Sequence, residues 1–346
     1  MRAPPPAVPA VAIADAAIDA APAQPAIAYP PALERPMGCA FSGEWKLQPR
    51  ELAFVPGGKP YATMSRVERA DAMLGDTVYA ELRGRSLQIG GYVDAAKVRV
   101  FAATPMLIAG WVMPHAEVAL AYRGTKGDRV QFEIPAPAGV RAKATILGDE
   151  PCTAVAIDAT SDFQPRDAIE AKSIDSGQLY ENRAIPLSLE PDKPPVAQLQ
   201  YKNTPPPVEV LERKGKHVRV VVGVASLDPQ QHMLLVGWVP ASAVHKQASG
   251  FGGSWGDGGG EGTLGRRPDP NARYVTCDGP TPLIAELSGE RRLVGTIAPN
   301  AVIRLPPEDA DFMGVWIEKP DATLAEGARW LVARAAVAGC RATQRP

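Results

Sequence analysis

Short runs of alternating apolar and polar residues recur along the chain and predict β-strands. The pattern is clearest in AKVRV (96–100), KHVRVVV (216–222) and NAVIRL (300–305). Side chains of a strand point alternately to its two faces, so a period of two indicates a strand buried on one face. β-branched residues, which favour strands, are frequent in these runs. The pattern therefore predicts half-buried strands in three separate parts of the chain.

Glycines stand between such runs, where a hairpin needs a tight turn. They occur in RGR (83–85), SGE (288–290), VPGGKP (55–60) and ERKGKH (212–217). Glycine adopts the positive φ that tight hairpin turns require. Long amphipathic helical patterns are absent. The best helix candidate is the Ala-rich stretch 321–340, for which we nevertheless favour a strand. The predicted fold class is all-β.

Two long segments of the chain match each other without gaps. Residues 78–112 can be laid on residues 283–317, and Gly90 then falls on Gly295. The same match places Trp111 on Trp316. In addition, MLIAGWVMP (106–114) shares Gly-Trp-Val with MLLVGWVP (233–240). Constant spacing from a strand scaffold is typical of a core position, because register fixes the face that a side chain takes. We therefore predict structural core positions, rather than a repeated binding motif, at Trp111, Trp238 and Trp316.

Residues 207–245 resemble the bacterial SH3-like (SH3b) domain. In that family a strand pair with a central glycine turn leads to Gly-Trp-Val and a short P-x-x-x-V close. The third segment departs from this pattern, since its GVWI shifts the glycine by one position. The resemblance implies small, partly open five-stranded barrels that serve as wall-binding or protein-binding modules in envelope proteins. The matching residues are Val210, Leu211, Gly215, Val218, Val220, Gly237, Trp238, Val239, Pro240 and Val244.

The predicted organisation is a disordered tether followed by tandem SH3-like β-barrels. Two stretches rich in glycine or polar residues are interpreted as linkers. The segments are a tether (1–36), module 1 of one or one and a half units (37–160), a linker (161–183), module 2 (184–248), a Gly-rich linker (249–270) and module 3 (271–342).

The first 36 residues carry an Ala/Pro/Asp bias that is typical of an extended, disordered chain. Pro and Asp interrupt any apolar stretch, so the segment is not a signal peptide as it stands. It resembles the stretch that follows the lipidated cysteine in many envelope lipoproteins. That resemblance implies a periplasmic or cell-surface protein whose export signal is absent from this chain. A disordered leader on a cytosolic protein is the alternative.

Composition narrows the classes of partner. The 346 residues include 37 basic and 38 acidic side chains, for a net charge of −1. Nucleic-acid binding requires a basic face that displaces counterions, and no basic cluster is present. No apolar run approaches the roughly 18 residues of a transmembrane span. We therefore expect neither a nucleic-acid partner nor a transmembrane span.

The four cysteines do not form C-x-x-C, the usual spacing of zinc and thioredoxin-type sites. Three disulfide pairings are possible. The placement of the cysteines at the borders of the first and last segments favours Cys39–Cys152 and Cys277–Cys340. Four reduced, buried cysteines are the alternative.

No catalytic, metal or cofactor motif is recognisable, so we predict no catalytic or metal-binding residues, no cofactor and no enzymatic activity. Ser254 stands in a stretch too rich in glycine to hold a nucleophile rigidly, and a phosphate-binding loop of the G-x-x-x-x-G-K-[ST] type is absent. Exposed aromatic residues line SH3-like ligand grooves. The candidate ligand contacts, for which strand packing is the alternative role, are Tyr61, Tyr79, Tyr92, Tyr201 and Trp255.

These features together predict a non-catalytic binding or scaffolding protein of the bacterial envelope, with peptidoglycan or an envelope protein as its partner. A structural subunit of a multiprotein surface assembly is the first alternative. An enzyme whose active site forms between modules is the second.

Overall fold

The computed structural model describes residues 28–44, 50–137, 139–159, 161–202, 205–224, 233–246, 273–306 and 310–344. In these ranges the chain is all-β, as predicted, and its strands pair antiparallel in four sheets. None of the four sheets closes into a barrel within the described residues. The helical turns are η1 (Ala95–Lys97), η2 (Cys152–Ala154), η3 (Pro165–Ala168), η5 (Ala241–Ala243) and α1 (Arg334–Val337).

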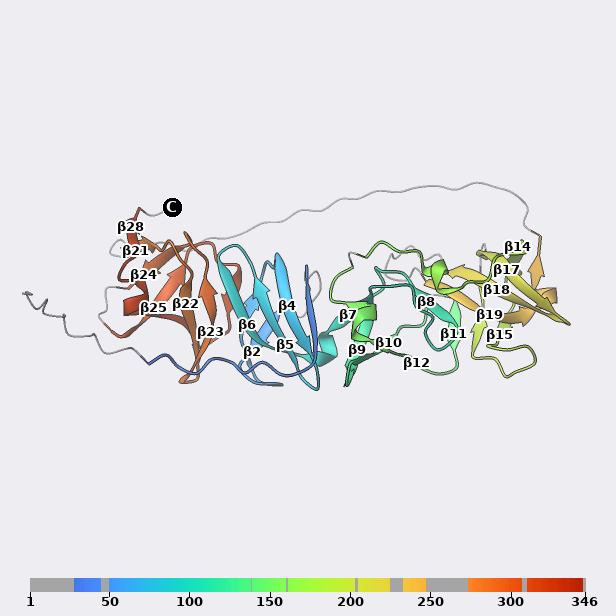
Figure 1. Ribbon diagram of the computed structural model, residues 1–346, viewed down its shortest axis with the longest axis horizontal. Helices are drawn as coiled ribbons and strands as arrows, with labels where there is room; N and C mark the ends of the chain where they lie inside the picture. Colours follow the sequence, from blue (N-terminus) through green and yellow to red (C-terminus); the bar gives the residue numbers. More distant parts are fainter. Residues whose placement is uncertain are drawn as a thin grey trace, which may run out of the picture.

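The largest sheet combines the first and last parts of the chain (Figure 1). Its strand order is β1-β4-β5-β6-β23-β22-β27-β25-β24-β21-β28, with β2, β3 and β26 paired beside this path. The strands are β1 (Cys39–Gly43), β2 (Glu51–Ala53), β3 (Pro60–Met64), β4 (Arg69–Leu74), β5 (Val78–Arg83), β6 (Leu87–Val93), β21 (Arg273–Thr276), β22 (Thr281–Leu287), β23 (Glu290–Ile297), β24 (Val302–Leu305), β25 (Phe312–Ile317), β26 (Ala322–Leu324), β27 (Ala328–Ala333) and β28 (Arg341–Thr343).

The two matching sequence segments meet in this sheet through equivalent strands. β6 pairs with β23 through Ile89↔Gly295, Gln88↔Thr296 and Leu87↔Ile297. Gly90 and Gly295 are equivalent in the two matching segments, so β6 and β23 are equivalent strands. Their antiparallel pairing relates the two segments by a local pseudo-two-fold axis. A Cβ at Gly295 would lie 2.0 Å from the Gln88 carbonyl oxygen, so the close approach of the strands requires glycine there.

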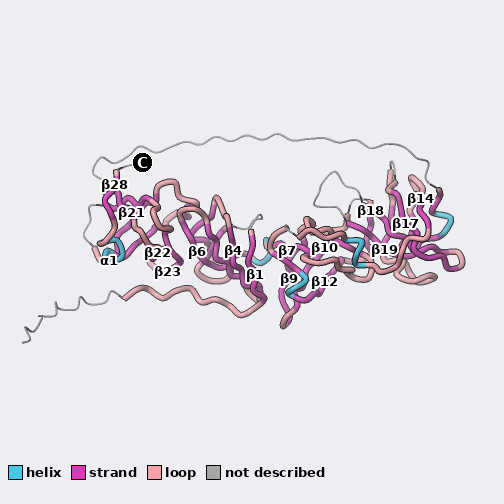
Figure 2. Tube along the Cα trace, turned by 45° about the horizontal axis from the view of Figure 1, so that its top comes forward, coloured by secondary structure: helices cyan, strands magenta, loops and turns pink. Residues whose placement is uncertain are grey.

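Residues 28–36, which the sequence assigns to the tether, lie across the large sheet. Tyr29 packs edge-on against Phe312 of β25, with ring centroids 6.4 Å apart. Leu293 on β23 donates a backbone hydrogen bond of 3.2 Å to the Pro31 carbonyl. The Tyr92 hydroxyl on β6 donates a hydrogen bond of 2.8 Å to the Glu34 carbonyl. These contacts place an extended segment along the sheet before β1, where Figure 2 shows it as a long loop.

Three smaller sheets form the other half of the molecule, drawn in green and yellow in Figure 1. β11 pairs with β16 and β8 pairs with β19, so hydrogen-bonded sheets cross the predicted boundary between the first and second modules. The strands are β7 (Arg99–Ala102), β9 (Leu120–Lys126), β10 (Arg129–Ile134), β12 (Ile146–Pro151) and β13 (Val155–Ala156); β11 (Val140–Ala142), β15 (Ile185–Leu187) and β16 (Ala197–Leu199); and β8 (Val112–Pro114), β14 (Asp175–Leu179), β17 (Pro207–Lys214), β18 (His217–Val224), β19 (Met233–Pro240) and β20 (Val244–His245).

The molecule is elongated, with the large sheet at one end and the β14–β20 sheet at the other (Figure 1). β14 falls inside the predicted linker 161–183, where it pairs with β17 and β20. The Gly-rich linker 249–270 lies outside the described residues. The stretch 321–340 contains strands β26 and β27 followed by the single turn α1, which agrees with the preference for strand there.

Candidate functional site

The large sheet carries a groove beside Trp316. Along β25, Met313, Val315 and Ile317 point into the core, so the alternating residues face outward, and Trp316 is 53% exposed. β25 and β27 separate after the pair Val315↔Trp330. The groove has a volume of about 700 Å³. It is lined by Pro306, Gly314, Val315, Trp316, Ile317, Pro320, Ala322, Thr323, Leu324, Ala328, Arg329 and Trp330.

Cationic side chains flank this aromatic surface. The Arg304 guanidinium lies 4.3 Å from the centroid of the Trp316 ring, because the two residues are cross-strand partners on β24 and β25. Such a contact contributes roughly 0.5–1 kcal/mol at an exposed site. Arg329 is held by an ion pair of 2.7 Å to Glu286. Hydrogen bonds from Arg291 and Arg329 keep the pKa of Glu286 below its usual value, so this carboxylate stays ionised beside the groove.

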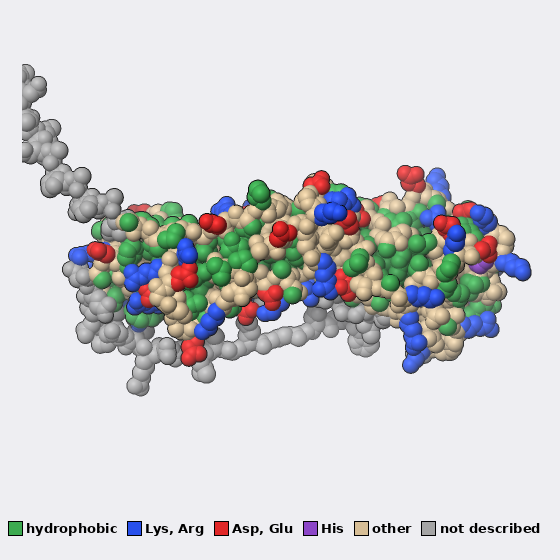
Figure 3. All heavy atoms as spheres, turned by 90° about the horizontal axis from the view of Figure 1, so that it is seen from below, with side chains coloured by type: hydrophobic (Ala, Val, Ile, Leu, Met, Phe, Trp, Pro, Cys, Tyr) green, Lys and Arg blue, Asp and Glu red, His purple; other side chains and the backbone are tan. Residues whose placement is uncertain are grey.

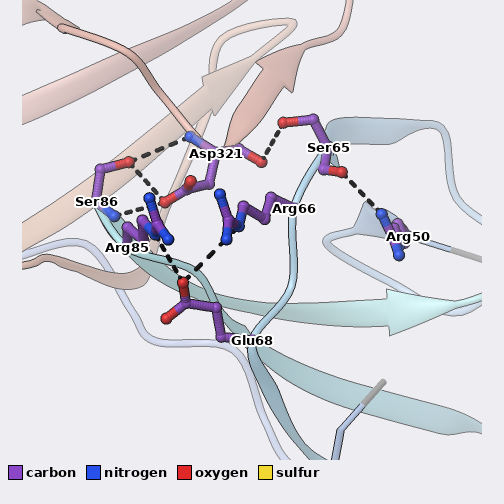
Figure 4. Close-up of polar contacts among 7 residues, drawn as sticks. All are labelled: Arg50, Ser65, Arg66, Glu68, Arg85, Ser86 and Asp321. Atoms are coloured by element: carbon purple, nitrogen blue, oxygen red, sulfur yellow. Dashed lines mark hydrogen bonds and ion pairs between the residues drawn. The ribbon is translucent and has the colours of Figure 1, made fainter. Parts of the chain in front are cut away.

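One wall of the groove is β26, which a buried aspartate fixes to the N-terminal half of the sheet (Figure 4). Asp321 directly precedes β26 and is 7% exposed. Its carboxylate accepts hydrogen bonds from the backbone N–H of Ser86 and from the Ser86 hydroxyl, the latter at 2.8 Å. Its carbonyl accepts from the backbone N–H and hydroxyl of Ser65 at 2.6 and 2.8 Å. Residues more than 230 positions apart are thereby joined at one point.

The surroundings of Asp321 leave little room for movement. A Cβ at Gly84 would lie 2.6 Å from the Asp321 carboxyl carbon, so only glycine fits at that position. Next to the buried Asp321–Ser86 contact, Arg85 forms an exposed ion pair of 2.9 Å with Glu68. Arg50 donates a hydrogen bond of 2.8 Å to the Ser65 carbonyl. The close-up in Figure 4 shows these residues gathered around the loop that enters β26.

Tyr61, a predicted ligand contact, lies behind the groove in the core. It has no exposed surface, stacks on Phe54 at 4.8 Å and contacts the Trp330 ring edge-on at 6.1 Å. Its hydroxyl donates to the Gly90 carbonyl at 2.8 Å. Burial raises the pKa of Tyr61 well above its usual value. A ligand cannot reach this side chain, which supports the groove from within.

The other predicted ligand contacts do not gather at one site. Tyr79 is 5% exposed and packs edge-on against Tyr92, with centroids 5.6 Å apart, while burial raises its pKa to about 12. Tyr79 is therefore a packing residue, and Tyr92 holds the segment at Glu34. Tyr201 belongs to the other half of the molecule. Trp255 lies outside the described residues.

Two of the three predicted core tryptophans are buried, and the third is not. Trp111 and Trp238 are 4% and 7% exposed, whereas the prediction for Trp316 is wrong. In the first two cases tryptophan directly follows the glycine; in GVWI it follows one residue later. A shift of one residue turns a side chain to the opposite face of a strand. Val315 takes the inward position, and Trp330, 4% exposed, supplies the aromatic ring of this core.

The four cysteines form the two disulfides that their placement favours. Cys39 is joined to Cys152, with Cα atoms 5.8 Å apart, and Cys277 to Cys340, with Cα atoms 4.4 Å apart. The first bridge connects β1 of the large sheet to the end of β12 in the five-stranded sheet. The second holds the end of β21 to the start of β28.

A second pocket of about 320 Å³ lies on the strands β1, β4 and β5. At its rim the Ser42 hydroxyl donates to the Asp71 carboxylate, and Arg69 donates to the same hydroxyl oxygen at 2.9 Å. None of the residues that line this pocket is a histidine. A serine nucleophile needs an adjacent base, and Asp71 here acts as a hydrogen-bond acceptor within a surface network. In the described ranges no group of three His, Cys, Asp or Glu side chains is placed to hold a metal ion.

Comparison with known proteins gives no relative from which a role could be transferred. No family model, no curated protein and no solved structure matches the chain. In the part of the chain that the structure describes, no helix has the length and apolarity needed to cross a membrane.

Proposed function

We propose that this chain is a non-catalytic binding or scaffolding protein of the bacterial envelope, and that it binds its ligand in the Trp316 groove. The observation that carries the proposal is a large aromatic side chain, 53% exposed, at the edge of a groove of about 700 Å³. Ligand sites are typically concave, of roughly 300–1,000 Å³, with apolar walls and a few polar groups. Thr323, Arg304 and Arg329 supply the polar groups here.

The two disulfides support an oxidising compartment. Disulfides persist mainly in secreted, periplasmic and surface proteins. The first bridge joins the large sheet to the five-stranded sheet, and the second lies beside the paired strands β21 and β28, which fits a structural role. The face shown in Figure 3 carries basic and acidic side chains interspersed with hydrophobic ones, so its charge does not select a strongly charged partner. Peptidoglycan or an envelope protein remains the proposed ligand.

The proposal keeps the SH3-like interpretation of residues 184–248. β17, β18 and β19 form an antiparallel meander, and the register Val220↔Gly237 aligns the V-x-V strand with Gly-Trp-Val. The P-x-x-x-V close forms the turn η5 and the short strand β20, which returns to pair with β14. This order of elements is what the sequence resemblance leads us to expect.

Sedimentation with purified sacculi tests the proposal on the full chain. We expect the chain to sediment with sacculi and Trp316→Ala to lose most of this binding, because the ring forms the exposed edge of the groove. Ile174→Ala is a matched control, since Ile174 is an exposed apolar residue (61%) far from the groove. If the chain does not sediment, or if both variants lose binding equally, wall binding through this groove is refuted.

A structural subunit of a surface assembly is the second candidate function. β12 ends the five-stranded sheet, and its outward Leu147 is 60% exposed. An open edge strand with an apolar side chain is suited to pairing with another chain. Light scattering coupled to size exclusion tests this idea: assembly should be lost in Leu147→Lys, and a strictly monomeric wild-type chain refutes it.

A further inference from the structure

A row of outward-facing side chains crosses the large sheet at the Trp316 groove. Arg304 on β24 is the cross-strand partner of Trp316. On the other side of the groove, Arg329 on β27 is the partner of Glu286 on β22, which in turn is the partner of Arg291 on β23. Cross-strand partners share one face of a sheet, and both Trp316 and Arg329 are exposed. The row therefore presents three arginines and one carboxylate around an exposed tryptophan.

The positive charge of this row is only partly matched by carboxylates. Within the described ranges Arg304 has no ion-pair partner, and its guanidinium lies against the Trp316 ring. Glu286 forms ion pairs with both Arg291 and Arg329. Of the described residues that line the groove, Arg329 alone is charged. Because a guanidinium stacked on a ring keeps its N–H edges free to bind a carboxylate through two hydrogen bonds, the groove is suited to an anionic ligand.

The same groove contains an unpaired stretch of strand edge. β27 pairs with β25 as far as Val315, so among the described strands Trp316 and Ile317 have no partner on that side. On the opposite side the backbone N–H of Glu318 donates to the Val302 carbonyl of β24 at 2.9 Å. Backbone groups of successive residues point to opposite edges of a strand, so those of Ile317 are directed toward the groove. An extended peptide adds to such an edge through main-chain hydrogen bonds.

We propose that the Trp316 groove binds an extended acidic segment of an envelope protein, which adds to the free edge of β25 and places a carboxylate between Arg304 and Arg329. The inference rests on the proposed function, since it names the ligand of the same site. Alternate side chains of a bound strand share one face, so an acidic residue opposite Trp316 meets both guanidiniums. The free edge favours a peptide over a glycan or a lipid, because a peptide offers N–H and C=O groups at strand spacing.

Arg304 should supply much of the preference for an acidic residue. A hydrogen bond to a charged group is among the stronger ones, so Arg304→Gln should weaken binding about tenfold or more. Arg304→Lys keeps the charge but not the two-bond geometry, and should give an intermediate affinity. Arg213→Gln is the matched control, because Arg213 on β17 is 55% exposed and forms an ion pair with Asp175 in the other half of the molecule. This control should leave the Kd unchanged.

The test selects peptides from a phage-displayed library of random linear heptapeptides on the immobilised full chain. We expect the selected peptides to share Asp or Glu at one position, and to lose their enrichment on the Trp316→Ala chain. A synthetic copy of the most enriched peptide is then titrated against the wild-type chain and the arginine variants. Two further copies, N-methylated on the odd or on the even backbone amides, report strand addition. Because one edge of the peptide pairs with β25, methylation of one set should abolish binding and methylation of the other should not.

Failure to enrich any peptide relative to the Trp316→Ala chain overturns the proposal. Selected peptides without a common acidic residue, or equal losses of affinity in Arg304→Gln and Arg213→Gln, overturn the anionic site. Equal effects of the two N-methylated sets overturn strand addition. If no peptide is enriched and the chain instead binds phosphatidylglycerol vesicles through Arg304, the row belongs to a lipid-binding surface and the proposal is wrong.

The selection contains no sacculi, so its failure is distinguishable from failure of the proposed function. If the chain sediments with sacculi through Trp316 and no acidic peptide is selected, the inference fails while the proposed function stands. If acidic peptides bind through Arg304 and the chain does not sediment, wall binding is refuted and the inference stands.

Discussion

Asp321→Ala tests the long-range connection that holds the groove wall in place. The substitution removes the two hydrogen bonds that the carboxylate accepts from the backbone N–H and the hydroxyl of Ser86. It leaves the bonds from Ser65 to the Asp321 carbonyl intact, because these involve the backbone. The variant therefore isolates the side-chain part of the connection between β26 and the N-terminal half of the sheet.

The magnitude follows from burial and charge. Asp321 and Ser86 are 7% and 8% exposed, so water does not readily replace the lost partner. A hydrogen bond to a charged group contributes about 1.5–3 kcal/mol, and a buried donor left without a partner has a similar cost. Because the two effects overlap, we expect Asp321→Ala to lower the free energy of unfolding by about 3–5 kcal/mol.

Urea-induced unfolding followed by tryptophan fluorescence measures this change. Glu68→Ala is the control, since Glu68 is 45% exposed in its ion pair with Arg85 and should contribute about 0–1 kcal/mol. Asp321→Asn keeps the shape of the side chain but loses its charge, so its loss of unfolding free energy should lie between those of Glu68→Ala and Asp321→Ala. If Asp321→Ala is no more destabilising than Glu68→Ala, the carboxylate does not secure β26 and the reasoning is wrong.

Three further predictions follow from burial and connectivity. Trp330→Ala should lower the free energy of unfolding by about 3–5 kcal/mol, whereas Trp316→Ala, at the surface, should change it by about 1 kcal/mol or less; equal effects in urea unfolding contradict the placement of these rings. Cys277→Ser with Cys340→Ser opens a connection between residues 63 positions apart and should cost about 4 kcal/mol on the loop-entropy model, measured as a lower urea midpoint without reductant, where the Cys39–Cys152 bridge stays closed. Burial raises the pKa of Tyr201 to about 12, above the roughly 10 of an unfolded chain, so the contribution of this residue to stability is complete below about pH 10 and is lost as pH rises to about 12. Its hydroxyl has no hydrogen-bond partner among the described residues, so Tyr201→Phe should leave stability at neutral pH unchanged or raised and weaken this alkaline loss, and a destabilised variant refutes the assignment.

Local patterns predicted the strands well because period-two burial is a local property. The KHVRVVV run lies in β18, and the glycine turn at Gly215 has φ +57°, as a tight hairpin requires. The sequence matches also carried three-dimensional information: equivalent strands β6 and β23 pair directly with each other. What the matches could not show was that the equivalent units share one sheet, since pairing partners depend on which edges meet in the folded chain.

The misplaced tryptophan shows how finely the face of a strand depends on register. The ungapped match placed Trp316 on Trp111, and the departure GVWI was visible in the sequence. Read from the glycine, the inward residue is Val315, and the tryptophan one step later must point outward. Reading the period from the glycine rather than from the tryptophan would have found the exposed ring, and with it the groove.

The groove itself could not be derived from local pattern, because its walls come from distant parts of the chain. β26 lies beside β25 and β27 because it pairs with β3, in the register Thr323↔Thr63, and because Asp321 is held by Ser86. Without Asp321, the three residues of β26 would make few contacts that hold the strand in this position. The site that binds a ligand in our proposal is therefore a product of the union between the first and last segments. Its integrity should depend on residues such as Ser86 that no ligand would touch.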